Sequence, residues 1–177
     1  MMYHNKDEWD LENEYKMQKE QEKISYKQCF IRQMIESDLN EVCRIEQESF
    51  SMPWTKKAIA DSLKNENNVY LVAEYAGKIA GYCGMWGIAG EGQINHVAVT
   101  QAYRENGIAS KMMKVLIEEG CKKNLTEFTL EVRESNLAAI RLYEKTGFQK
   151  EGIRKGFYDA PKENAVIMWL RICSNFH

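Results

Sequence analysis

The chain has 177 residues, enough for one domain with a sizeable core, and its net charge of −2 excludes a general attraction to nucleic acid or to an acidic membrane. Five widely spaced cysteines without a C-x-x-C pair, and three histidines, predict reduced thiols and no metal site. The chain starts with charged residues, lacks a signal-peptide pattern and has no apolar run of membrane-spanning length, so we expect a cytoplasmic protein.

Residues 1–28 differ from the remainder because they are rich in Glu, Lys, Gln and Asn and poor in aliphatic side chains. Such a composition is typical of a solvent-exposed helix or a disordered extension, and a partner-binding helix is the alternative. We therefore divide the chain into a charged N-terminal extension, 1–28, and one globular domain, 29–177.

The expected elements of the domain follow from hydrophobic spacing and from turn and cap residues. In chain order they are a strand at 29–34, a helix capped at 37–38 and ending near 50, a helix capped at 55, strands at 69–75, 78–85 and 93–100, a helix from 108 to a stop at 120, a strand at 126–132, a helix at 137–146, and strands at 148–155 and 165–172. The segment 87–92 reads as a flexible connection, and Gly81 and Gly84 indicate a bulge or close packing. The order β-α-α-β-β-β-α-β-α-β-β predicts a single-domain α/β sandwich with a mixed central sheet flanked by helices.

One stretch, 97–120, combines a strand end, a short loop and an amphipathic helix. The first N–H groups of a helix have no internal partner and lie at the positive end of its dipole. Gly107, Ala109 and Ser110 are small enough to let a ligand approach the backbone, so an anion such as a pyrophosphate could dock there. A helix that begins after a glycine without any ligand is the alternative, and the pattern of a P-loop triphosphate site is missing.

Several short motifs accompany this loop. Arg104, Gly107 and Ala109 match Q/R-x-x-G-x-G/A, and further matches are S-F-S-M-P-W at 49–54, L-E-V-R-E-S-N at 130–136, A-A-I-R-L-Y-E-K-T-G-F at 138–148 and A-V-I-M at 165–168. Together they resemble the GNAT superfamily of N-acetyltransferases, and within it the ribosomal-protein-alanine N-acetyltransferases. The resemblance covers roughly residues 30–173 and implies the same fold that the element order predicts.

The resemblance also implies a co-substrate and an acceptor. The co-substrate is acetyl-CoA, without a metal, and the acceptor is a protein N-terminus, that of small-subunit ribosomal protein eighteen. The pyrophosphate of acetyl-CoA would bind at Arg104, Glu105, Asn106, Gly107, Ile108, Ala109 and Ser110. The backbone of Val97, Ala98 and Val99 would pair with the pantetheine amides as an extra strand does, and one N–H there would polarise the thioester carbonyl. The acyl group would lie where this strand and the strand of Glu131 splay apart.

Two residues are candidates for proton transfer. Glu131 lies near the end of its strand, on the face opposite Leu130. Burial statistics alone favour a solvated glutamate at such a position. The resemblance implies instead that Glu131 is the general base. Asn136 and Tyr143 share one helix face. The resemblance implies that Asn136 binds the pantetheine arm and that Tyr143 protonates the departing thiolate, and a core tyrosine is the alternative.

The hypothesis is direct attack of an amine on acetyl-CoA. An α-amine titrates near ~8 and a lysine near ~10.4, so roughly two orders of magnitude more of the α-amine is neutral at about pH 7.

Residues 50–54 and 156–158 are read as walls of a peptide groove or as packing aromatics, and His96 as a core histidine. The rival functions are acetylation of a small amine or of another protein N-terminus, and a non-catalytic acyl-CoA-binding module.

Overall fold

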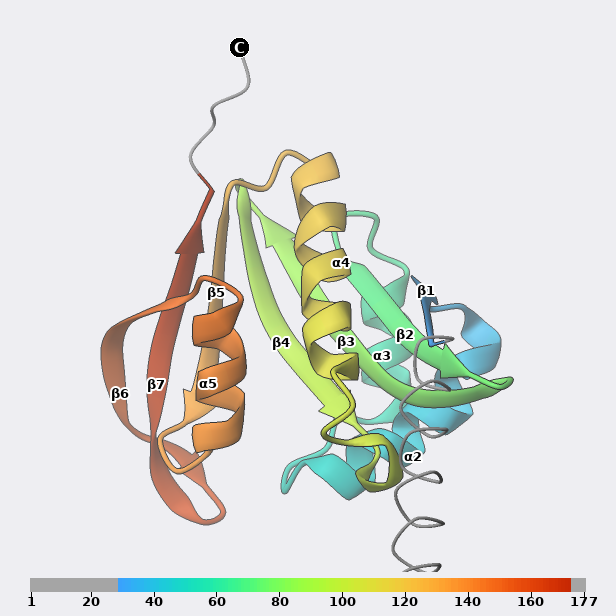
Figure 1. The fold of residues 1–177 in the computed structure, drawn as a ribbon, viewed down its shortest axis with the longest axis horizontal. Coiled ribbons are helices and arrows are strands. Elements are labelled where there is room, and N and C mark those ends of the chain that lie inside the picture. The colour runs from blue at the N-terminus through green and yellow to red at the C-terminus, as the bar shows by residue number, and fades with distance from the viewer. Residues whose placement is uncertain (1–28, 173–177) are drawn as a thin grey trace, which may run out of the picture.

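In a computed structural model of the chain, residues 29–172 are described, and they form a seven-stranded mixed sheet with helices on both faces (Figure 1). The strand order is β1-β2-β3-β4-β5-β7-β6, and every neighbouring pair is antiparallel except β4 and β5. The elements are β1 (Phe30–Gln33), α2 (Leu39–Ser49), α3 (Lys56–Leu63), β2 (Val69–Tyr75), β3 (Lys78–Ile88), β4 (Glu91–Val99), α4 (Ile108–Lys122), β5 (Glu127–Arg133), α5 (Leu137–Lys145), β6 (Gln149–Asp159) and β7 (Lys162–Arg171), with two short 3-10 helices at Glu36–Asp38 and Gln101–Tyr103. The predicted element order and fold class are confirmed. The predicted extension 1–28 lies outside the described residues.

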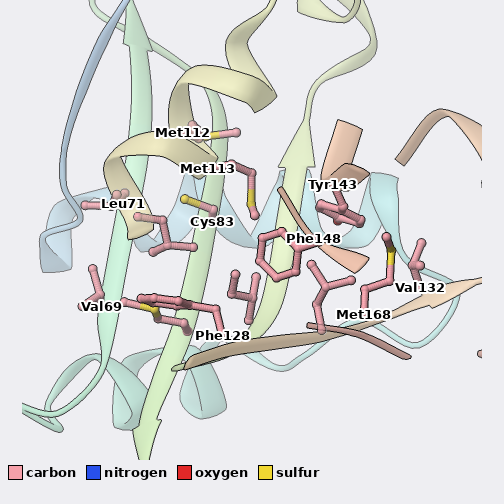
Figure 2. Packing of buried hydrophobic residues seen from close by; sticks show 14 of the residues in the cluster. Val69, Leu71, Cys83, Met112, Met113, Phe128, Val132, Tyr143, Phe148 and Met168 are labelled. Carbon is pink, nitrogen blue, oxygen red and sulfur yellow. The ribbon is translucent and has the colours of Figure 1, made fainter. Parts of the chain in front are cut away.

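The sheet separates two hydrophobic cores. Helices α4 and α5 cover one face, and α2 and α3 cover the other (Figure 1). Alternate residues of β2 enter different cores: Val69 and Leu71 join the core on the α4 side, and Tyr70 and Val72 join the core on the α2 side. Figure 2 shows part of the first core, with Phe128 among its labelled residues.

The prediction of a flexible connection at 87–92 is wrong. Strands β3 and β4 continue through this segment and stay paired up to Ile88 and Glu91. The turn between them consists only of Ala89 and Gly90, both with positive φ, at 49° and 88°. Gly87 and Gly92 serve packing instead, since a Cβ would lie 2.4 Å from the carbonyl oxygen of Asn67 at the first and 2.7 Å from Cδ1 of Phe128 at the second.

Gly120 does not end its helix, contrary to expectation, because α4 runs on to Lys122. A Cβ at Gly120 would lie 2.6 Å from Cε1 of Phe128 and 2.7 Å from Cε of Met85. The glycine therefore lets α4 approach the sheet closely. The chain turns at Asn124, whose φ is 61°.

The helix caps follow the prediction in one of two cases. The hydroxyl of Thr55 accepts from the amide of Ala58 at 3.1 Å, as predicted. Asp38 stands at the start of α2, but its carboxylate does not cap that helix. Instead it accepts two bonds from Arg32, at 2.7 and 2.9 Å, and one from the amide of Ile35.

Strands β6 and β7 are longer than predicted. They form a hairpin that closes at Ala160 and Pro161, and their register shifts between Arg154 and Tyr158. This hairpin occupies the edge of the sheet next to β5, which brings residues late in the chain beside the strand that carries Glu131 (Figure 1).

Candidate active site

The two central strands separate at their carboxyl ends. Parallel pairing of β4 with β5 stops at Ile94 and Leu130, although β4 continues to Val99 and β5 to Arg133 (Figure 1). A bulge accompanies the separation, since β3 pairs with Ile94 and His96 and skips Asn95. The prediction of a bulge or close packing at Gly81 and Gly84 is confirmed: the β2–β3 register shifts next to Gly81, and the Cβ of a side chain at Gly84 would lie 2.3 Å from the ring of Tyr70.

The three β4 residues predicted to bind pantetheine, Val97, Ala98 and Val99, lie on the separated part of the strand. One edge of β4 pairs there with β3, and within residues 29–172 no strand lies beside the other edge. Backbone groups on an open strand edge can bind an extended amide chain. The separation creates the space between β4 and β5 that the sequence argument requires.

The loop before α4 leaves a run of backbone N–H groups open. Gly107 is the N-cap residue of α4 and has a φ of 76°, and Glu105 also has a positive φ, 62°. Within residues 29–172, no amide from 105 to 110 is recorded as a hydrogen-bond donor, and the first that donates is Lys111, to the carbonyl of Gly107 at 3.0 Å. Ile108, Ala109 and Ser110 are the first three residues of the helix. Such a run of N–H groups at a helix start can hold an anion.

The polar side chains of this loop bind its own backbone. Arg104 donates through Nε to the carbonyl of Val99 at 3.0 Å, and Asn106 donates to the carbonyls of Tyr103 and Arg104. Lys111 donates to the carbonyl of Cys29. These contacts shape the loop, and the binding of a pyrophosphate by Arg104 stays a prediction.

Glu131 occupies the position expected of it. Phe128, Leu130 and Val132 point into the core, so Glu131 lies on the opposite face of β5, at the separated end, with its side chain 26% exposed. Its Oε1 lies 2.9 Å from Nη1 of Arg154 on β6. This partner was not predicted, because no local pattern links the two strands.

Tyr143 is buried in the core between β5 and α5, with its ring centroid 6.1 Å from that of Phe148 (Figure 2). Burial raises the pKa of its hydroxyl, and Tyr158 and Cys83 nearby raise it further. The hydroxyl therefore stays protonated at neutral pH, which a proton donor to a thiolate requires.

Asn136 is the N-cap residue of α5. Its side-chain oxygen accepts from the amide of Ala139 at 3.1 Å. The oxygen is thus committed to the helix, and the side-chain NH₂ is the group that a ligand could use.

A buried carboxylate that the sequence argument missed lies on the face of the sheet that α2 and α3 cover. Glu46 of α2 is 1% exposed and accepts from the amide of Trp54 at 2.8 Å and from the hydroxyl of Tyr82. His96, 4% exposed, places Nε2 3.5 Å from the same carboxylate and packs its ring centroid 4.4 Å from that of Trp54. Burial opposes ionisation of Glu46, but bonds from His96, Trp54 and Tyr82 together hold its pKa below the ordinary value. An acidic residue on the apolar face of a helix, one turn after Val42, was the available signal.

His96 is a buried histidine as predicted, and it organises one predicted groove wall. The ring centroids of Phe50 and Trp54 lie 5.9 and 4.4 Å from that of His96. These two aromatics therefore pack inward, whereas Met52 between them is 69% exposed. On the second predicted wall, Phe157 is 41% exposed.

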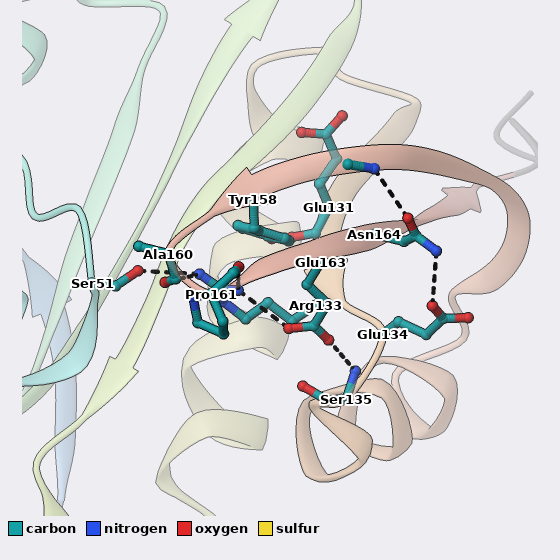
Figure 3. A network of polar contacts seen from close by, with 11 residues as sticks. Ser51, Glu131, Arg133, Glu134, Ser135, Tyr158, Ala160, Pro161, Glu163 and Asn164 are labelled. Atoms are coloured by element: carbon teal, nitrogen blue, oxygen red, sulfur yellow. Dashed lines mark hydrogen bonds and ion pairs between the residues drawn. The ribbon is translucent and has the colours of Figure 1, made fainter.

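Arg133 connects the two predicted walls (Figure 3). Its guanidinium donates to the hydroxyl of Ser51, which follows α2, and to the carbonyls of Ala160 and Pro161 between β6 and β7. It also stacks over the ring of Tyr158, 4.1 Å from its centroid.

The chain matches a family profile described as Acetyltransferase (GNAT) family over residues 39–148, which is more than half of its length. This chain belongs to the GNAT family of acetyltransferases. The resemblance drawn from the motifs is confirmed, and the protein is an acyltransferase.

Relatives of this acetyltransferase cover nearly the whole domain. A putative ribosomal protein bS18-alanine N-acetyltransferase of Bacillus subtilis is 38% identical over 143 residues, which are 80% of this chain and 95% of the relative. The ribosomal protein bS18-alanine N-acetyltransferase of Escherichia coli K12 is 34% identical over 140 residues, 77% of this chain and 93% of the relative. The crystal structure of the ribosomal-protein-S18-alanine N-acetyltransferase from E. coli superposes with a TM-score of 0.75 at 30% identity, covering 84% of this chain and 99% of that one.

Residues 29–172 show neither a metal-binding cluster nor a membrane-spanning helix. No cluster of three or more His, Cys, Asp or Glu side chains is arranged to hold a metal ion there. None of the helices in this part of the chain is both long and apolar enough to cross a membrane.

Proposed function

We propose that this GNAT acetyltransferase transfers the acetyl group of acetyl-CoA to the N-terminal alanine of ribosomal protein bS18. The observation that carries the proposal is the identity of 34–38% to relatives named for this activity, over 93–95% of their length. A ribosomal acceptor also implies that the enzyme works in the cytoplasm.

The proposed cofactor site runs along the separated end of β4 to the start of α4. The open amides of 105–110 bind the pyrophosphate, and the free edge of β4 at Val97, Ala98 and Val99 pairs with the pantetheine amides. Asn136 offers its NH₂ group from the start of α5. These contacts place the thioester between β4 and β5.

The proposed reaction is a direct transfer in a ternary complex. The neutral α-amine attacks the thioester carbonyl, the C–N bond forms, and the C–S bond breaks. Glu131, acting through a water, takes the proton that the amine loses, and Tyr143 gives its hydroxyl proton to the CoA thiolate. A β4 backbone N–H stabilises the oxyanion between these steps.

With a carboxylate as the base, an α-amine is a better acceptor than a lysine amine, because a larger fraction of the α-amine is already neutral at physiological pH. Ser51 of the first predicted wall (50–54) and Tyr158 of the second (156–158) both contact Arg133, which shares a strand face with Glu131. We assign the acceptor peptide to the space beside these walls.

The test is a steady-state assay of CoA release with three acceptors. The first is a short peptide that copies the N-terminus of bS18, the second is the same peptide N-blocked and carrying a lysine, and the third is a polyamine. Turnover of the free N-terminus alone supports the proposal. Turnover only of the polyamine or the lysine peptide, or tight acetyl-CoA binding without turnover of any acceptor, contradicts it in favour of a rival function.

A further inference from the structure

Arg133 is the last residue of β5, and its guanidinium is almost completely engaged. Nη1 donates to the carbonyl of Pro161 at 3.1 Å and to Glu163 at 3.2 Å, and Nη2 donates to Ser51 at 3.1 Å and to the carbonyl of Ala160 at 2.9 Å. Four of the five N–H groups of an arginine are thereby used. A guanidinium so occupied has little capacity left to bind substrate or to move a proton.

The bonds of Arg133 join segments that are distant in the sequence. Ser51 lies 82 residues before Arg133, in the α2–α3 loop (50–55), and Ala160 lies 27 residues after it, in the β6–β7 turn (160–161). The same nitrogen, Nη2, binds both. The separation of the loop and the turn at this point is therefore set by the size of one planar group (Figure 3).

The surroundings of the guanidinium favour a fixed geometry. The side chain of Arg133 is only 23% exposed, the ring of Tyr158 lies against it, and Glu163 neutralises its charge. The other oxygen of Glu163 accepts from the amide of Ser135 at 2.6 Å, next to the N-cap of α5. Hydrogen bonds to charged groups in partly desolvated sites are stronger than those on an open surface.

Arg133 also lies next to the chemistry. It is two residues from Glu131 on the same face of β5, and the hydroxyl of Tyr158 donates to the carbonyl of Glu131 at 3.3 Å. The α2–α3 loop contains the predicted wall 50–54, and the β6–β7 turn directly follows the end of β6, which contains the predicted wall 156–158. An acceptor chain that brings its amine to Glu131 between these walls therefore passes between the loop and the turn.

We infer that Arg133 is a positioning residue that holds the α2–α3 loop and the β6–β7 turn at the separation that the acceptor peptide needs. This inference rests on the proposed function for the identity of the acceptor, but not for the contact between the two walls. Lysine cannot replace it, because one ammonium cannot reach four acceptors arranged around a plane.

The experiment uses four variants of the full chain: Arg133→Met, Ser51→Ala, the double variant, and Arg171→Met as a control. Arg171 is matched to Arg133 because it too is an ion-paired arginine at the last position of a strand, bound to Glu151 and stacked on Trp169, but away from both walls. Kinetics are measured with whichever peptide the parent turns over. Amide hydrogen exchange of 50–55 and 156–161 is measured without any substrate.

We expect Arg133→Met to raise the KM for the acceptor roughly tenfold and Ser51→Ala to raise it about threefold, with the KM for acetyl-CoA unchanged. The double variant should match Arg133→Met alone, because Ser51 acts through Arg133. Exchange should speed up in both walls of Arg133→Met, and Arg171→Met should behave like the parent. Ser51 is exposed, so its variant reports on the contact even if Arg133→Met folds poorly.

An acceptor KM in Arg133→Met equal to that of the parent would overturn the inference, as would effects that multiply in the double variant. If the parent turns over no peptide, the proposed function fails by itself. The exchange measurement then decides the inference, since unchanged protection of both walls in Arg133→Met would refute it.

Discussion

Arg154 of β6 holds Glu131 of β5 through an ion pair of 2.9 Å between Nη1 and Oε1, across the intervening strand β7. The guanidinium also lies 5.1 Å from the ring centroid of Phe157. One carboxylate oxygen is thereby occupied, so the other is the one that can receive a proton. The pair restricts the orientation of the proposed base before an acceptor arrives.

Replacing Arg154 by Gln should lower kcat by roughly tenfold, because Glu131 then rotates freely and spends less time in the productive orientation. The affinity for acetyl-CoA should not change. Arg171→Gln, which breaks an ion pair on the same hairpin, is the control for general effects on β6 and β7. A kcat equal to that of the parent would show that the pair does not position the base.

Glu131→Gln should lower kcat by about 100-fold or more, because general base catalysis contributes at least that factor. The amide keeps the shape of the side chain, so the dissociation constant for acetyl-CoA should stay within about twofold of the parent value. Calorimetric titration with acetyl-CoA and steady-state kinetics across pH separate the two effects. Full activity of this variant at every pH would remove Glu131 from the mechanism.

Gly107→Val should weaken acetyl-CoA binding, by roughly tenfold, because the side chain covers the open amides at the start of α4. The glycine has a φ of 76°, so strain alone should also cost about 1–2 kcal/mol of folding free energy. Gly77→Val is the matched control, because Gly77 has a φ of 74° and equally open surroundings but lies in the β2–β3 turn. Equal losses of stability in the two variants, with CoA affinity lost only in Gly107→Val, would fit the pyrophosphate assignment. Undiminished affinity in folded Gly107→Val would contradict it.

Glu46→Gln should reduce the free energy of unfolding at pH 7 by about 3 kcal/mol, because it removes a buried charge that bonds from His96, Trp54 and Tyr82 stabilise. The pKa of Glu46 is depressed in the folded state, so its contribution is complete above the ordinary value of 4.5 and is lost as the pH falls through the depressed value. Denaturant unfolding should therefore show a large difference in the free energy of unfolding between parent and variant at pH 7, and a smaller difference near pH 3.

The control for Glu46 is Glu48→Gln on the same helix. Glu48 is half exposed and, within residues 29–172, pairs only with Arg44, so its loss should change stability by less than about 1 kcal/mol. A Glu46→Gln variant as stable as Glu48→Gln would mean that the buried carboxylate is not favourably paired.

The local pattern of the sequence determined the elements, their order and the family. Alternation placed Glu131 opposite Leu130, Thr55 capped α3, and the R-x-x-G-x-A spacing marked the start of α4. These features depend on residues within a few positions of one another, where backbone geometry alone decides which side chains share a face. Homologues then confirmed the family that the motifs suggested.

Tertiary structure alone decided the partners of those residues. Arg154 reaches Glu131 across β7, which lies between β6 and β5 in the sheet, and Arg133 reaches Ser51 in the loop between α2 and α3. Gly120 lies within α4 rather than at its end because Phe128 of another element leaves no room for a Cβ. Such contacts join residues far apart in the chain, and their existence depends on strand order and packing distance, which no local spacing encodes.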